Sequence, residues 1–100
     1  KIDKVLVEIK GSKGGVTAGK AFTRSQVKAV QAKEATCAYC GVKPKKVDVD
    51  HIIPKSLNGN RTPKNSQPTC PSCNRSKGNR YFPKNYSFYQ KLRWFLDEKR

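Results

Sequence analysis

Two Cys-x-x-Cys pairs constrain the fold of this chain more than any other feature. The pairs are Cys37 with Cys40 and Cys70 with Cys73, and Gly41 allows the first to turn back sharply. Each pair presents two thiolates on one tight turn, and two such turns form a closed tetrahedral zinc site when the fold brings them together. The alternatives are two structural disulfides or a redox pair. Cys-x-x-Cys is too tight for a common structural bridge and redox motifs rarely occur twice, so we expect four zinc ligands.

Polar residues of a catalytic type lie between and just after the two pairs. Asp50 and His51 follow a β-type run, Asn65 lies in a polar loop, and Asn74 comes directly after the last cysteine. His51 is the only histidine, and its unperturbed pKa makes it a ready base near neutral pH. Each residue alone has a structural explanation: a hydrogen-bonded Asp–His pair, a turn with Ser66, or a helix cap. Their joint arrangement inside the cysteine frame favours a catalytic site.

The segments that carry these residues resemble a known family. Val47 to Pro54 (VDVDHIIP), Asn65 and Cys70 to Gly78 (CPSCNRSKG) are similar to the HNH endonucleases, which have a ββα-metal fold with four zinc-binding cysteines. The resemblance covers about residues 37 to 79. The third letter of the family name is Asn74 here, as in HNN variants. The fold class that the resemblance implies is α+β, a small zinc-stapled ββα-metal domain with flanking helices.

The resemblance also implies an activity, a divalent-metal-dependent endonuclease. His51 would deprotonate the attacking water, Asn65 would hold its imidazole in orientation, and Asp50 and Asn74 would bind one Mg²⁺ or similar cation through oxygen ligands. The cation would polarise the phosphate and stabilise the leaving 3′ oxygen. Because neighbours on a regular strand point to opposite faces, Asp50 and His51 can serve one site only where the strand bends or ends, and Pro54 favours an ending.

The charge of the chain indicates a polyanionic partner. Its formal charge is +15 in 100 residues, with 22 Lys and Arg against 7 Asp and Glu. Such a chain concentrates nucleic acid around it and binds phosphates by releasing counterions. Arg75, Lys77 and Arg80 are expected to contact the phosphates, and DNA is the expected substrate. The alternatives are a solvated basic surface, an acidic protein or an anionic membrane. As a function, the alternative is a non-catalytic zinc-containing module that binds nucleic acid.

The length of the chain indicates one small domain, whose modest core zinc would stabilise. We expect three parts, with an N-terminal strand and helix over 1–36, the zinc and ββα-metal core over 37–79, and a C-terminal aromatic helix over 80–100. No apolar run is long enough to span a bilayer, and none resembles a signal peptide.

Local patterns predict the individual elements. Val5, Val7 and Ile9 alternate, which predicts a strand over 2–10, and a glycine-rich connector follows it. Thr23 and Gln26 form a capping box that predicts a helix carrying Val27, Val30 and Ala35. The core is expected to contain strands over 47–52 and 67–70, a polar loop over 56–64, and a helix from about Ser72 that ends at Gly78. At the C-terminus, Ser87 would cap a helix whose Phe88, Leu92 and Phe95 pack on the zinc core, with base stacking as the alternative.

Two further segments suggest a biological role. Lys20 to Thr23 and Pro68 to Asn79 resemble the C-terminal toxin nucleases of bacterial polymorphic-toxin systems, and a restriction or phage homing nuclease is the competing role. A toxin role would imply an acidic immunity protein as partner. Zinc-bound cysteines fit a reducing compartment, so we expect action in a cytoplasm, reached by secretion or delivery as part of a larger protein. The chain begins at Lys1 and contains no Met, and we therefore expect it to be part of something longer.

Overall fold

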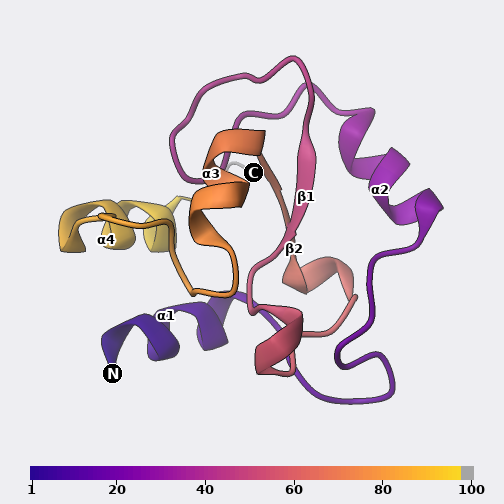
Figure 1. Ribbon diagram of the computed structural model, residues 1–100, viewed down its shortest axis with the longest axis horizontal. Helices are drawn as coiled ribbons and strands as arrows, with labels where there is room; N and C mark the ends of the chain where they lie inside the picture. Colours follow the sequence, from indigo (N-terminus) through magenta and orange to yellow (C-terminus); the bar gives the residue numbers. More distant parts are fainter. Residues whose placement is uncertain (98–100) are drawn as a thin grey trace.

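The structure, a computed structural model, describes residues 1–97 and has an α+β architecture (Figure 1). This class agrees with the sequence-based expectation. The elements in chain order are α1 (Ile2–Lys10), α2 (Arg24–Gln31), β1 (Asp48–His51), the 3-10 helices η1 (Lys55–Leu57) and η2 (Pro63–Asn65), β2 (Ser66–Thr69), α3 (Pro71–Lys77) and α4 (Phe88–Leu96).

A two-stranded antiparallel hairpin lies at the centre of the molecule. β1 and β2 pair with Asp48 opposite Thr69 and His51 opposite Ser66. α3 follows β2 and packs on one face of the hairpin, and α2 covers the other face (Figure 1). This is the expected ββα unit, with β1 one residue shorter at each end than predicted and β2 beginning and ending one residue earlier. The alternation of a β-strand then sends Asp48 and Asp50 toward α3, and Val49 and His51 toward α2.

The start and end of α3 follow from its sequence. Cys70 is the N-cap residue, and its Sγ accepts a hydrogen bond from the backbone N–H of Cys73 at 3.4 Å. Pro71 occupies the first helical turn, where its missing N–H has no intrahelical partner to lose. Gly78 ends the helix with φ of 51°, a backbone conformation that favours glycine. The predicted helix and its stop are therefore confirmed.

The N-terminal segment is a helix, so the predicted strand over 2–10 is wrong. Leu6 is 5% and Val7 0% exposed, and Asp3 pairs with Lys91 of α4 at 3.0 Å. The sequence also has apolar residues at helical spacing, which coexist with the alternation that suggested a strand. A helix satisfies its own backbone hydrogen bonds, whereas a strand needs a partner. Within residues 1–97 the two strands pair with each other, and α1 packs on α4 instead.

The predicted capping box at Thr23 and the predicted cap at Ser87 are both present, and Ser87 also forms a capping box. The Thr23 hydroxyl accepts from the Gln26 backbone at 3.2 Å, and the Ser87 hydroxyl accepts from the Gln90 backbone at 3.1 Å. However, α2 ends at Gln31, so Ala35 lies beyond it.

The packing of α4 follows the predicted stripe only in part, since Phe95 is partly buried against the core. Trp94 is 2% exposed, whereas Phe88 is 59% exposed and does not reach the core. Trp94 stacks with Tyr39 and meets Phe82 edge to face, and its indole N–H donates to Gln67 at 2.9 Å. An aromatic ring with one polar atom can fill the core and still satisfy a buried amide, which explains why Trp94 points inward.

Candidate functional site

The four cysteines come together as predicted. Their Sγ atoms all lie within 4.8 Å of one another, and those of Cys40 and Cys70 are 3.8 Å apart. Zinc–sulfur bonds of about 2.3 Å in a tetrahedron separate the sulfurs by about 3.8 Å. All four are free thiols, so the disulfide alternative does not apply. The donor set and its spacing therefore fit a structural zinc ion.

The first cysteine turn is shaped by its backbone. Gly41 has φ of 78° and donates to the carbonyl of Cys37 at 2.9 Å, and Cys37 donates to Val42 at 2.7 Å. Ala38 donates to Pro68 of β2 at 2.9 Å. The turn is thus bonded to the hairpin, and the cysteine cluster joins it to the start of α3.

His51 lies on the α2 face of β1 and is half-buried. Its Nε2 is 3.0 Å from the carbonyl oxygen of Lys20. Because a carbonyl only accepts, Nε2 carries the proton and the neutral ring has its lone pair on Nδ1. The ring of Phe22 stacks on the imidazole with centroids 4.0 Å apart and an interplanar angle of 22°.

The surroundings of His51 also set its protonation. Burial lowers the pKa of His51 below its ordinary value of 6.5, although the Lys20 carbonyl and the charge of Asp50 oppose this. The ring is therefore neutral near pH 7, with Nδ1 able to accept a proton.

Asn65 does not contact the imidazole, so its predicted role as the orienting partner of His51 is wrong. Its side chain is 0% exposed, and its Oδ1 accepts from the backbone N–H groups of Ser12 and Ile53, both at 3.0 Å. Its Nδ2 donates to the carbonyls of Ile53 at 3.1 Å and Asn60 at 2.9 Å. The amide is fully used by main chain that would otherwise be buried without partners. Asn65 instead fixes the segment that follows β1.

Asp50 is part of a buried polar network. Its Oδ2 accepts from Lys77 Nζ at 2.6 Å, Gln67 Nε2 at 2.9 Å and the Tyr39 hydroxyl at 3.4 Å. Burial raises the pKa of Tyr39 well above its ordinary value, and the Asp50 charge adds to this effect, so the phenol remains a proton donor. These donors compete with the divalent cation that the family resemblance implies at Asp50.

Lys77 is the charged donor to Asp50, and the structure contradicts its predicted contact with phosphates. The side chain is 0% exposed and also donates to the carbonyls of His51 at 2.6 Å and Ile52 at 3.0 Å. Burial lowers the pKa of Lys77, although Asp50 opposes this. The physical reason is that a buried carboxylate needs a counter-ion, and Lys77 lies on the face of α3 that meets β1. Arg75 and Arg80 are exposed and remain accessible to phosphates.

Asp48 is a residue that the sequence reasoning missed. The Asn74 amide donates to Asp48 Oδ2 at 3.2 Å, and both side chains are half-buried. The signal for Asp48 was its two-residue spacing from Asp50, which places both on one face of a strand. Asn74 thus meets the carboxylate of Asp48, while that of Asp50 is paired with Lys77.

These features agree with a comparison against known families. Residues 37–80 match the model of the HNH endonucleases. This part of the chain is therefore similar to that family. No curated protein and no solved structure matches the chain. HNH endonucleases are metal-dependent nucleases that act on nucleic acid. The matched segment contains both cysteine pairs, the hairpin and α3, while α1, α2 and α4 lie outside it. In residues 1–97, no helix is long and apolar enough to cross a membrane.

Proposed function

We propose that this HNH protein hydrolyses phosphodiester bonds in DNA, with His51 as the general base. The observation that carries the proposal is the environment of His51 within the family match. Its Nε2–H donates to the Lys20 carbonyl, which leaves Nδ1 to take a proton from water. The net charge of +15 supports a polyanionic substrate.

The residues suited to a divalent cation such as Mg²⁺ lie on the α3 face of β1. Asn74 was the expected ligand from the helix, and we propose Asp48 as its partner in place of Asp50. Asp48 contacts Asn74 at 3.2 Å, whereas Asp50 is paired with a buried ammonium. An amide and a carboxylate offer the oxygen ligands that a hard cation prefers, and the Asn74 amide can turn its oxygen toward it. When bound, the cation would neutralise charge on the phosphate and at the leaving oxygen.

His51 and Asp48 point to opposite faces of β1, about 10 Å apart along the strand. Among the described residues β1 pairs only with β2, so one edge of the strand has no strand partner. We place the scissile phosphate across that edge, where side chains from both faces can reach it. Arg75 and Arg80, on and just after α3, would contact neighbouring phosphates.

A plasmid-nicking assay tests the proposal most directly. Zinc-loaded protein should nick DNA with Mg²⁺ and not with a chelator of Mg²⁺ that leaves zinc in place. His51→Ala should bind the plasmid and leave it intact. Tight binding without nicking by the wild type, across DNA and RNA substrates, would favour the non-catalytic zinc module instead.

The biological role that we propose is that of a toxin domain acting in a target cell's cytoplasm, on the strength of the resemblance at 20–23 and 68–79. Its partner would be an acidic immunity protein, because a surface with net charge +15 is complementary to one. Expression without that partner should kill cells through DNA damage, and His51→Ala should be harmless. Normal growth with active, soluble wild-type protein would rule out the toxin role and leave the nuclease intact.

A further inference from the structure

Two residues outside the family match hold the imidazole of His51. The match begins at residue 37, whereas Lys20 and Phe22 precede α2. The Lys20 carbonyl accepts from Nε2 at 3.0 Å, and the Phe22 ring covers one face of the imidazole at 4.0 Å between centroids. One contact fixes the direction of the ring within its plane, and the other fixes the plane itself.

We propose that the segment 20–22 is a positioning element for the nuclease, which sets the tautomer and the orientation of His51. The inference rests on the proposed role of His51 as general base. A base must present its lone pair within hydrogen-bond reach of the attacking water, and a small misplacement costs rate. Asn65, the residue expected to supply this orientation, is bonded to main chain instead.

The segment is anchored on both sides, so its two contacts are held in place. Before it, Gly19 donates to the carbonyl of Gly59 at 2.9 Å. After it, the Gln26 amide donates to the carbonyl of Arg61 at 2.6 Å, from the capping box that starts at Thr23. Both anchors lie in the loop between β1 and β2. The segment therefore forms a strap across the α2 face of the hairpin.

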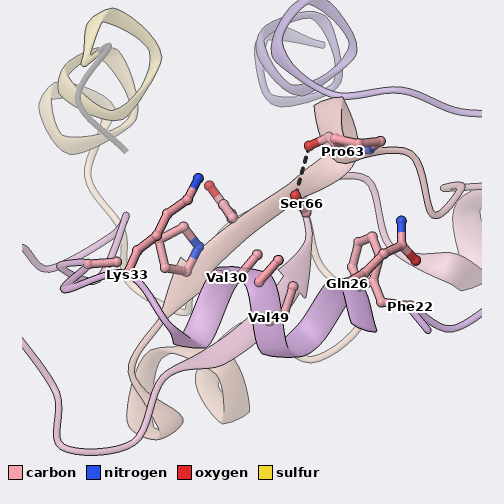
Figure 2. A pocket seen from close by; sticks show the side chains of 11 residues that line it. Phe22, Gln26, Val30, Lys33, Val49, Pro63 and Ser66 are labelled. Atoms are coloured by element: carbon pink, nitrogen blue, oxygen red, sulfur yellow. Dashed lines mark hydrogen bonds between the residues drawn. The ribbon is translucent and has the colours of Figure 1, made fainter. Parts of the chain in front are cut away.

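The setting of Phe22 makes the proposal testable. A groove of about 320 Å³ lies between α2 and the hairpin and is lined by Phe22, Gln26 and Val49 among others. Figure 2 shows Phe22 at one end of it. Phe22 is only partly buried and belongs to the edge of this groove rather than to the core. Replacing it should therefore leave the fold intact, and the groove gives room for a phenol in place of the phenyl ring.

The experiment compares Phe22→Ala, Phe22→Leu and Phe22→Tyr with the wild type by nuclear magnetic resonance and steady-state cleavage. Because His51 is the only histidine, its ring signals are unambiguous. The wild type should show the Nε2–H tautomer, and its ring protons should be shifted upfield by the stacked phenyl ring. Phe22→Ala and Phe22→Leu should lose the upfield shift. Their kcat should fall about 10-fold with KM nearly unchanged, because a misplaced base loses part of the rate enhancement that general base catalysis provides. Phe22→Tyr should restore both.

The matched control is Val16→Ala, an apolar residue of the same N-terminal segment that is 92% exposed and should change neither signal nor rate. An Nδ1–H tautomer in the wild type would overturn the proposal. So would unshifted ring signals in a folded Phe22→Leu protein, or an unchanged kcat. If the wild type cleaves no nucleic acid, the proposed function fails, but the ring signals still decide whether the segment positions His51.

Discussion

The two faces of β1 differ in how tightly they are packed. On the α3 face, Asp50 is 7% exposed and Lys77 0% exposed, and the two are joined at 2.6 Å. On the α2 face, a groove of about 320 Å³ lies between strand and helix, and α2 buries none of its residues. His51 belongs to the open face. The comparison indicates that one side of the strand supplies rigidity and the other leaves room for a reacting group.

The largest effect is expected from breaking the cysteine cluster, which fixes α3 to the packed face. Cys70→Ser should leave the domain unfolded, because structural zinc sites contribute about 10 kcal/mol or more and the core is small. Circular dichroism and zinc analysis of purified protein measure this. Wild-type protein that contains two disulfides and no zinc would contradict the assignment.

The packed face can be tested directly at its buried ion pair. Lys77→Met should lower the free energy of unfolding by about 3–5 kcal/mol, because it leaves the Asp50 carboxylate buried without a counter-ion. Urea denaturation measures the change, and Arg75→Met on the exposed side of α3 is the control. Adding Asp50→Asn to Lys77→Met should recover part of the loss. Equal stability of the two single variants would show that Lys77 is not a buried counter-ion.

A substitution on the α2 face should change the cleavage rate and leave the free energy of unfolding nearly unchanged. His51→Ala should lower the cleavage rate by about 10²-fold or more, since it removes the general base, and should leave urea stability and DNA affinity nearly unchanged. Cleavage by a folded His51→Ala protein at the wild-type rate would show that the base lies elsewhere.

Replacing Arg75, on α3, or Arg80, just after it, should affect binding alone. Arg75→Ala and Arg80→Ala should each reduce the slope of log affinity against log salt by about one unit, if each releases counterions through one phosphate. Lys77 should contribute nothing to that slope, because its ammonium is buried. Titrations at several salt concentrations measure the slopes. A salt-independent affinity would point to a ligand other than nucleic acid.

The smallest expected effect is in the pH dependence of cleavage. Burial lowers the pKa of His51 below 6.5, so the neutral base persists to lower pH than in an exposed histidine. The acid limb of the rate profile should therefore lie below pH 6.5, and activity should be lost only as the pH falls through the lowered pKa. A limb above pH 6.5 would contradict the burial of the imidazole in the working enzyme.

Local sequence signals predicted the parts of the molecule that depend on few residues. The capping box at Thr23, the cap at Ser87, the stop at Gly78 and the cysteine cluster each follow from short-range chemistry, and all are present. The family pattern also indicated the hairpin and α3. The predicted roles of Asp50 and Asn74 toward a cation remain predictions, and the structure brings Asp48 rather than Asp50 to Asn74.

The failures at the site and in the N-terminal segment involve partners distant in sequence. The sequence around Lys77 predicts a surface cation, but the fold pairs it with Asp50 of β1, which is 27 positions away in the sequence. The contact of His51 with Lys20 spans 31 positions. The segment predicted as a strand over 2–10 forms the helix α1 instead, which packs on α4. Single-sequence patterns report local preference, and tertiary contacts decide which of two compatible patterns is used.

The contacts of Trp94 determine how far the domain can be shortened at its C-terminal end. Its indole N–H satisfies Gln67, whose amide in turn donates to Asp50, so the network beneath β1 reaches into α4. A fragment trimmed to residues 37–80 would keep the four cysteines, Asp48 and Asn74, and would lose this indole at one end and Phe22 at the other. The shortest fragment that keeps both contacts therefore begins no later than Gly19 and ends no earlier than Trp94.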